Sequence, residues 1–357
     1  MWPYFVLIFL PALIPLINKK PFTIRTEKWK NDNAMKLFWF LLFLLLILRS
    51  YDVGTDIRNY KNIFELISKN NWQWAAYRSS EYGWNLLNKA VSCITSNFRW
   101  ILVISAWLPI MLLNRYYSKY STDTVLTIAL FINISCFVLM FSGLRQSISI
   151  SLGLLAFECV MQKKKWSFVL CVAVAMTFHF SAFMLLLLYP ACNVRVKKSW
   201  LYWVIPVLIL IYVFNQPIFN FLGVLLASFT KYDAQIRLTG SYTMLILLLL
   251  FAVFSFVIPD EQLMDNETIA MRNLLLISVA LQMFAPLHSL AMRMNYYFLI
   301  FLPVLIPRVI KYRRKRFSQI AILSRYFLVV FFIGYFLIDA PKDNALATFP
   351  YQFFWEQ

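Results

Sequence analysis

The sequence predicts an all-α polytopic integral membrane protein that forms a single domain over residues 1–357. The chain is 61% hydrophobic and only 14% charged, whereas average soluble domains are about 45–50% apolar and about 25% charged. Apolar runs of about 20 residues, the length that crosses a bilayer, recur along the chain. Because these runs are continuous and not alternating, they exclude an outer-membrane barrel.

Basic loops set the direction of the threading, because Lys and Arg collect in cytoplasmic loops. The loop 18–36 carries six cations against two anions and is expected inside the cell. The first 17 residues lack a basic leader and a cleavage site, so we expect a retained span. About 10–12 transmembrane helices follow, with both termini extracytoplasmic. The other expected cytoplasmic loops are 163–165, 191–199, 259–271 and 311–317, and the expected spans lie near 36–48, 98–113, 124–141, 145–161, 200–214, 241–258, 272–290, 294–310 and 318–338.

The stretch 166–190 is long enough for one crossing, yet one crossing would place the later basic loops outside. We therefore predict a short or re-entrant helical hairpin with His179 near its turn. Such irregular backbone is tolerated only inside protein or beside a cavity. Two extracytoplasmic loops are expected, at 49–97 and 215–240. The first has the tryptophans and amphipathic spacing of helices that lie on the membrane interface.

Composition also limits the ligands. The formal charge of +18 suggests nucleic acid, but loop topology explains a basic membrane protein better, so we expect no nucleic-acid partner. The five cysteines lack metal-ligand spacing. We expect no disulfide, no cofactor and no metal.

With this threading, the polar segments gather at the outer surface. This one-sided placement predicts a cavity that is open to the outside. Arg145 in "FSGLRQSIS" lies between two apolar spans, and a charge there usually has a partner or ligand. Snorkelling to headgroups is the alternative. Gly143 would allow close backbone approach. Gln146 is suited to a sugar hydroxyl or to a neighbouring helix.

Other polar residues each have a structural alternative. Asp56 is also in position to cap a helix, and Asp52 with Arg58 would form a surface ion pair. His179 would bind substrate or bond across helices. Arg293 and Tyr296 would bind a ligand or anchor a span at the interface.

Six motifs, in order, resemble the EpsG family of Wzy-type polysaccharide polymerases. "RSYDVGTDIRNY" (49–60) is similar to its Arg-x3-Val-Gly-Thr-Asp-x3-Tyr signature. The others are "EYGW" (81–84), "GLRQSIS" (143–149), "HFSAF" (179–183), "RMNYYF" (293–298) and "PYQFF" (350–354).

The resemblance implies a metal-independent glycosyltransferase that joins polyprenyl-pyrophosphate-linked oligosaccharide repeats at the outer face of the bacterial cytoplasmic membrane. It implies an architecture like that of membrane-embedded lipid-donor glycosyltransferases, and a chain-length regulator and a flippase as pathway partners. Arginine suits a pyrophosphate leaving group because its fork binds phosphate oxygens bidentately. The expected pyrophosphate-binding residues are Arg49, Arg145 and Arg293; the general-base candidates are Asp56, His179 and Glu81; the further substrate-binding candidates are Gly143, Gln146, Tyr60, Arg237, Lys231 and Tyr296.

Three rival functions fit parts of the sequence. An O-antigen-ligase-like transferase would use the same donor with another acceptor. A flippase or transporter of the lipid-linked oligosaccharide would favour paired repeats and polar groups at mid-depth, and neither is evident. A membrane scaffold would tolerate Lys or Gln at the outer arginines.

Overall fold

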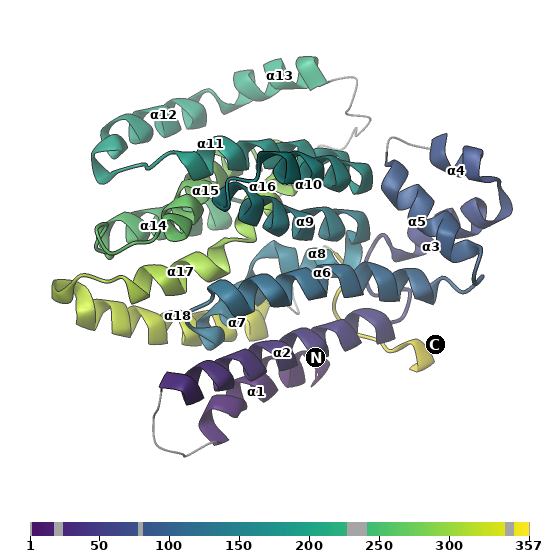
Figure 1. Ribbon diagram of the computed structural model, residues 1–357, viewed down its shortest axis with the longest axis horizontal. Coiled ribbons are helices and arrows are strands. Elements are labelled where there is room, and N and C mark those ends of the chain that lie inside the picture. The colour runs from purple at the N-terminus through teal and green to yellow at the C-terminus, as the bar shows by residue number, and fades with distance from the viewer. Residues whose placement is uncertain (1, 18–23, 78–80, 227–240, 340–345, 357) are drawn as a thin grey trace. The chain divides into compact units, whose positions relative to one another are not determined.

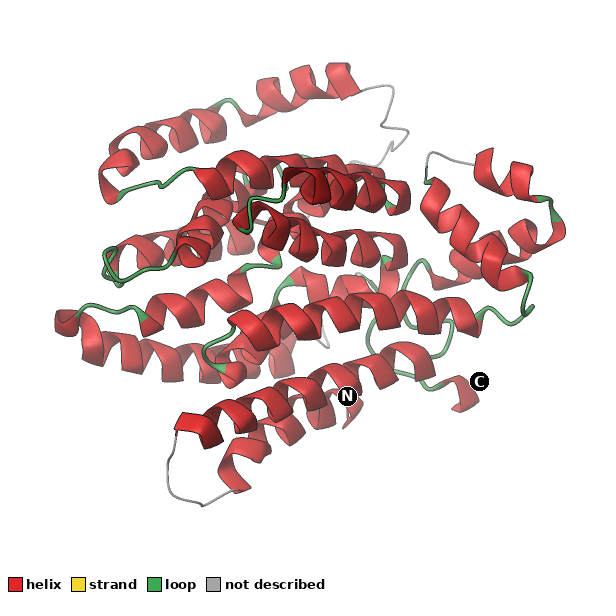
Figure 2. Cartoon of the chain, viewed as in Figure 1, coloured by secondary structure: helices red, strands yellow, loops and turns green. Residues whose placement is uncertain are grey.

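The computed structural model describes residues 2–17, 24–77, 81–226, 241–339 and 346–356. Every regular element in these ranges is a helix (Figure 2), which agrees with the predicted all-α class. The helices fall into two compact units. Unit 1 comprises Met1–Phe183 and Ile322–Gln357, and unit 2 comprises Met184–Ala321.

Unit 1 carries the motifs of the first half of the chain and the C-terminal tail (Figure 1). Its helices are α1 (Trp2–Ile17), α2 (Ile24–Leu48), α3 (Ile57–Lys69), α4 (Trp72–Tyr77), α5 (Tyr82–Ser92), α6 (Arg99–Tyr120), α7 (Thr124–Asn133), α8 (Ser135–Ser142), α9 (Leu144–Met161), α10 (Lys165–Phe178), most of α18 (Ser318–Asp339) and η4 (Phe354–Glu356).

Unit 2 begins inside η1 (Phe180–Leu187), a 3-10 helix that continues from unit 1. It then contains α11 (Leu188–Asn193), η2 (Lys198–Trp200), α12 (Leu201–Val213), α13 (Asn215–Leu226), α14 (Ser241–Val257), α15 (Asn266–Gln282), α16 (Ser289–Leu299), α17 (Leu302–Lys311) and η3 (Lys315–Phe317).

The central helix of unit 1 is α9, which packs between α6 and α10. Most of its residues are buried, including the small residues Ser147, Ser149 and Ser151. Small side chains let helices approach closely within a bilayer. The Ser149 hydroxyl donates to the carbonyl of Ala175 on α10 at 3.0 Å. The sequence of α9 therefore fixes the hairpin that it forms with α10.

An aromatic core joins the first helices of unit 1 to its C-terminal part. Trp39 on α2 packs edge-on against Phe131 on α7, with ring centroids 4.9 Å apart. Tyr4 on α1 lies 4.6 Å from Phe349 in the tail and donates its hydroxyl hydrogen to the Thr348 carbonyl at 2.7 Å. Aromatic pairs of this kind add to the stabilisation that burial provides.

By length and composition, three helices in the described ranges can cross a membrane: Arg99–Tyr120, Leu144–Met161 and Lys315–Ile338. Counting each bent helix pair as one span raises this number to six. Five shorter apolar helices accompany them. These observations fit a polytopic membrane protein, while a count of ten to twelve spans stays a prediction.

Three expected spans differ in shape from the prediction. The span near 124–141 is bent by 57° between α7 and α8. At the end of α7, Asn133 donates to the carbonyl of Phe332 on α18 at 2.8 Å. The span near 294–310 is bent by 44° between α16 and α17, where Pro303 lies in the first turn of α17 and lacks a backbone N–H. The span near 272–290 begins earlier, at Asn266, where Asp265 caps α15 through the Thr268 N–H at 2.8 Å.

Three expected loops contain helices. The expected loop 18–36 is wrong from Ile24 onward, because α2 begins there and continues into the span expected near 36–48. The loop 49–97 forms α3, α4 and α5, as its amphipathic spacing predicted. Helix α3 buries Ile57, Tyr60, Phe64 and Ile67 on one face. The expected loop 215–240 is wrong in its first part, because residues 215–226 form α13. An early proline at 217 fits the first turn of a helix, and the apolar run behind it continues the helix.

The predicted division of 166–190 at His179 is confirmed. Helix α10 ends at Phe178, and His179 is extended, with φ −152° and ψ 120°. The 3-10 helix η1 starts at Phe180.

Unit 1 has two polar ends. At one end, Arg115 and Lys119 on α6 both bind the buried Glu158 on α9, at 2.6 and 2.7 Å. At the other end of α6, Arg99 donates to the carbonyls of Ile47 and Arg49, each at 3.4 Å. Segments predicted to be cytoplasmic thus meet at the first end, and segments predicted to be extracytoplasmic meet at the second.

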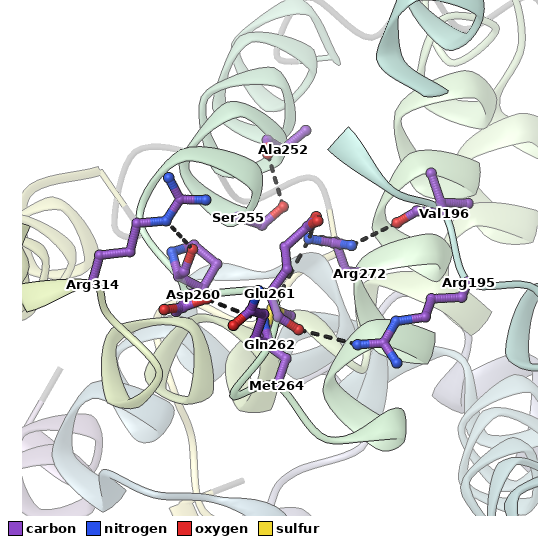
Figure 3. A network of polar contacts seen from close by, with 11 residues as sticks. Arg195, Val196, Ala252, Ser255, Asp260, Glu261, Gln262, Met264, Arg272 and Arg314 are labelled. Carbon is purple, nitrogen blue, oxygen red and sulfur yellow. Dashed lines mark hydrogen bonds and ion pairs between the residues drawn. The ribbon is translucent and has the colours of Figure 1, made fainter. Parts of the chain in front are cut away.

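Three charged loops, two of them basic and one acidic, meet at one end of unit 2 (Figure 3). The buried Arg272 on α15 binds Glu261 at 2.8 Å and donates to the Val196 carbonyl at 2.6 Å. The Arg314 N–H donates to the carbonyl of Ile258 at 3.0 Å. The loops 191–199, 259–271 and 311–317 therefore lie together. This agrees with the predicted threading, in which all three loops are on the same side of the membrane. The side of the membrane on which they lie stays a prediction.

Candidate active site

The site is built around Arg145, in the first turn of α9. Helix α8 ends at Gly143 and α9 starts at the next residue. A Cβ on Gly143 would lie 2.6 Å from Cδ1 of Leu139 on α8, so a side chain there would require the Leu139 side chain to move. The turn between α8 and α9 therefore leaves little room at Gly143. It places Arg145 at the second polar end of unit 1 with 26% of its side chain exposed.

Glu81 joins Arg145 to His179. Its Oε2 pairs with an NH of Arg145, and its Oε1 lies 2.6 Å from Nδ1 of His179. The Glu81 side chain is only 10% exposed. A carboxylate in such surroundings binds cations far more strongly than one in water. Arg145, Glu81 and His179 are called the central trio below.

Tyr60 holds Arg145 from another side. Its hydroxyl accepts from Nε of Arg145 at 3.3 Å, and the guanidinium carbon lies 5.3 Å from its ring centroid. The Tyr60 ring packs against Trp84 at 5.2 Å. A cation over an aromatic face is stabilised by about 0.5–2 kcal/mol. Arg145 is thus fixed by an acid, a hydroxyl and a ring.

Gly83 brings the trio together. A Cβ at this position would overlap the hydroxyl of Thr177, near the end of α10. Because glycine has no Cβ, α5 can approach α10, and the last turn of α10 leads directly to His179. Glu81 and His179 can therefore meet although 98 residues separate them.

Arg49 lies in unit 1, like the central trio, but its side chain is enclosed. Its side chain is 1% exposed and donates to the Phe141 carbonyl at 2.5 Å. Burial lowers the pKa of the Arg49 guanidinium to about 10, so it stays protonated at neutral pH. In this structure the charge of Arg49 supports the turn before Arg145.

Asp56 stands apart from the central trio. It precedes α3 without a side-chain capping bond, which contradicts the capping alternative. The other alternative for this segment is confirmed, since Arg58 and Asp52 form an exposed ion pair.

The remaining predicted residues lie in other places. Gln146 is buried on α9, beside Arg145. Arg293 and the buried Tyr296 lie on α16 in unit 2. Lys231 and Arg237 fall outside the described residues.

Sequence reasoning missed several supports of the site. Trp84, Thr177 and Ser142 each contact a motif residue. Trp84 belongs to the motif "EYGW" but was not among the candidate site residues, and Ser142 directly precedes the motif glycine Gly143. These positions were a usable signal. Nothing in the sequence marked Thr177. In the described ranges no three acidic, histidine or cysteine side chains converge as a metal site would require.

Fold and site together define a polytopic helical membrane protein with an Arg–Glu–His centre at one polar end of its first unit. The chain belongs to the EpsG family, whose model matches residues 33–353. This is a family of Wzy-like polysaccharide polymerases. No curated protein and no solved structure gives a significant match.

Proposed function

We propose that the protein joins polyprenyl-pyrophosphate-linked oligosaccharide repeats into a polysaccharide at the outer face of the cytoplasmic membrane. The observation that supports this most is the central trio, in which one buried acid holds a cation and a histidine together. The family membership gives the general activity of a polysaccharide polymerase. The lipid-linked donor, the outer face and the residue roles are the proposal.

The cation in this proposal binds the leaving group. Glu81 and Tyr60 hold two of the N–H groups of Arg145, and a quarter of the side chain is exposed. A guanidinium offers five N–H donors, so the exposed side can bind phosphate oxygens. Fixed cations near developing charge supply a large part of catalysis in such reactions. Arg145 would stabilise the pyrophosphate as negative charge grows on it.

The histidine in this proposal is the base. An acceptor hydroxyl attacks the anomeric carbon of the donor sugar while the bond from that carbon to the pyrophosphate breaks. The electron pair leaves with the pyrophosphate, and the hydroxyl proton passes to the imidazole of His179. The Glu81 carboxylate then stabilises the imidazolium, as the third member of a nucleophile–base–acid arrangement does. Asp56 is the weaker candidate, because it does not contact the trio.

The deciding experiment compares Arg145→Ala with Arg115→Ala in cells that lack the native gene. Arg115 is a suitable control, because it also binds a buried acid but lies at the opposite polar end of unit 1. We expect normal membrane levels for both variants. Arg145→Ala should leave single repeat units on the lipid, while Arg115→Ala makes long polymer. Gel separation of the lipid-linked glycans measures this.

The rival functions give other outcomes. A flippase defect would leave single units on the inner face, where an external glycosidase cannot reach them. A ligase defect would leave long polymer on the lipid that is never transferred. Full-length polymer from a well-inserted Arg145→Ala would reject the proposed site.

A further inference from the structure

The C-terminal tail pairs with the motif "RSYDVGTD". The backbone N–H groups of Gly54 and Thr55 donate to the carbonyls of Ala347 and Leu346, at 2.8 and 3.2 Å. The Ser50 N–H donates to the Gln352 carbonyl at 2.8 Å. Residues 346–353, called the tail segment, therefore run along this motif. The pairing uses backbone groups, which are costly to leave without partners when buried.

The aromatic side chains of the tail segment hold it in place. The Tyr351 hydroxyl donates to the Leu45 carbonyl at 2.8 Å. Phe353 pairs in an antiparallel bridge with Arg49 and packs against Trp2 at 5.6 Å. Tyr351 and Phe353 are buried, whereas the following Phe354 and Trp355 are 39% and 57% exposed.

The opposite side of the same motif supports the turn before Arg145. Gly54 has φ +104°, and a Cβ there would overlap the carbonyl oxygen of Phe141. The same oxygen accepts from Arg49. The hydroxyls of Thr55 and Ser142 share a hydrogen bond of 2.7 Å. The motif therefore contacts the tail segment on one side and the turn 141–143 on the other.

We propose that the tail segment is a positioning element of the active site: it sets the place of the turn 141–143 and thereby the direction of the Arg145 guanidinium. The inference rests on the proposed function, because the direction of the Arg145 guanidinium matters for turnover only if Arg145 acts in the reaction. The tail segment makes no contact with Arg145 in the described structure, so it acts through the motif. A displacement of about 1 Å at a reacting group can lower the rate about a hundredfold.

The test changes the side chains that hold the tail segment and leaves the motif intact. The variant is Tyr351→Ala/Phe353→Ala. The matched control is Tyr202→Ala/Phe221→Ala, which removes the same two kinds of aromatic side chain from exposed positions of α12 and α13. A third variant deletes residues 346–357. Purified proteins in lipid nanodiscs are given lipid-linked repeat units, and hydrogen exchange is followed in residues 50–57, 141–149 and 101–113.

For Tyr351→Ala/Phe353→Ala we expect faster exchange in 50–57 and 141–149 and unchanged exchange in 101–113. Turnover should fall at least about tenfold, with the KM for the donor changing less than about threefold, because the loss concerns transition-state stabilisation. The control should resemble wild type. The deletion should give the larger effect. If the deletion does not accumulate, the point variants alone decide.

Unchanged exchange in 141–149, or unchanged turnover, in Tyr351→Ala/Phe353→Ala would overturn the inference. An equal effect in the control would show that loss of any two aromatic side chains lowers turnover, and it would also overturn the inference. A failure of the proposed function looks different. In that case Arg145→Ala makes normal polymer, whereas the exchange data still report whether the tail segment orders the turn.

Discussion

At the scale of single residues, the decisive feature is the carboxylate that two basic groups share. Glu81 neutralises Arg145 and faces Nδ1 of His179. A buried charge without a partner is costly, and breaking a buried pair commonly costs about 3–5 kcal/mol. Each member of the trio therefore keeps the others in place, and Glu81 is the position where one change affects both.

Glu81→Gln tests this sharing. The amide keeps the size of the side chain but loses the negative charge, so Arg145 loses its ion pair and His179 loses the group that stabilises its protonated form. We expect turnover to fall about a hundredfold or more, as when an orienting acid is removed from a catalytic histidine. The measurement is turnover of lipid-linked repeats at several pH values.

Glu65→Gln is the matched control, because Glu65 is an exposed acid on α3 that pairs with Lys61, one turn earlier. It should keep wild-type turnover, because exposed pairs contribute little. Wild-type turnover from Glu81→Gln across the pH range would remove Glu81 from the mechanism.

At the scale of elements, the site depends on glycines at close approaches. Gly54 has positive φ and lies against the Phe141 carbonyl. Gly54→Ala adds a methyl group in a backbone region that L residues rarely adopt and in space that is already filled. We expect it to displace the turn 141–143, to lower the amount of folded protein in the membrane and to abolish polymer formation.

Gly334→Ala on α18 is the matched control. A Cβ built at Gly334 lies more than 4 Å from every described atom, apart from its two chain neighbours and the backbone of its own helix. Alanine is favoured over glycine in a helix interior by about 1 kcal/mol, so this variant should be as stable as wild type or slightly more stable. Fluorescence-detected thermal unfolding in detergent compares the two. Equal stability of both variants would show that the turn tolerates a side chain at 54.

The elements also show what the sequence could and could not reveal. Apolar runs and amphipathic spacing correctly predicted an all-helical chain, the helices of 49–97 and the break at His179. The hydrogen bond of Asn133, beside the bend after α7, to the Phe332 carbonyl was not predictable, because almost 200 residues separate the two. Each member of the trio was a candidate, but their contact was not, since the pairs are 64 and 98 residues apart. Local sequence patterns predict helices, whereas the site is formed by contacts between helices that are far apart in the sequence.

At the scale of the whole molecule, unit 2 is closed at one end by charged loops. Asp265 there binds Arg308, accepts from the Tyr312 hydroxyl at 2.7 Å and caps α15. Burial alone would raise the pKa of the Asp265 carboxyl, but bonds from Thr268, Arg308 and Tyr312 lower it to about 2. A lowered pKa in the folded state means that the charged form stabilises the fold.

The pH dependence of this network can be measured. Above the ordinary aspartate pKa of about 4 the contribution of Asp265 is complete, and it is lost as the pH falls through about 2, the pKa in the folded state. Asp265→Asn should therefore show faster hydrogen exchange in 258–268 than wild type at pH 7. The difference should narrow below pH 4 and vanish only below pH 2.

Asp260→Asn serves as the control in the same loop, where Asp260 Oδ1 accepts a local bond from the Gln262 N–H. A difference between Asp265→Asn and wild type that does not narrow between pH 4 and pH 2 would show that the carboxylate charge is not the cause.

The shared carboxylate also constrains how the chain can change over evolutionary time. Loss of Arg145 or His179 alone removes a partner of Glu81, and loss of Glu81 alone leaves a guanidinium without its counter-charge. A lineage that alters one position passes through an ancestor with an unbalanced enclosed charge, which selection removes. In an alignment of family members, residues 81, 145 and 179 should therefore be retained or replaced as a set. Their joint substitution would indicate that the three side chains are in contact.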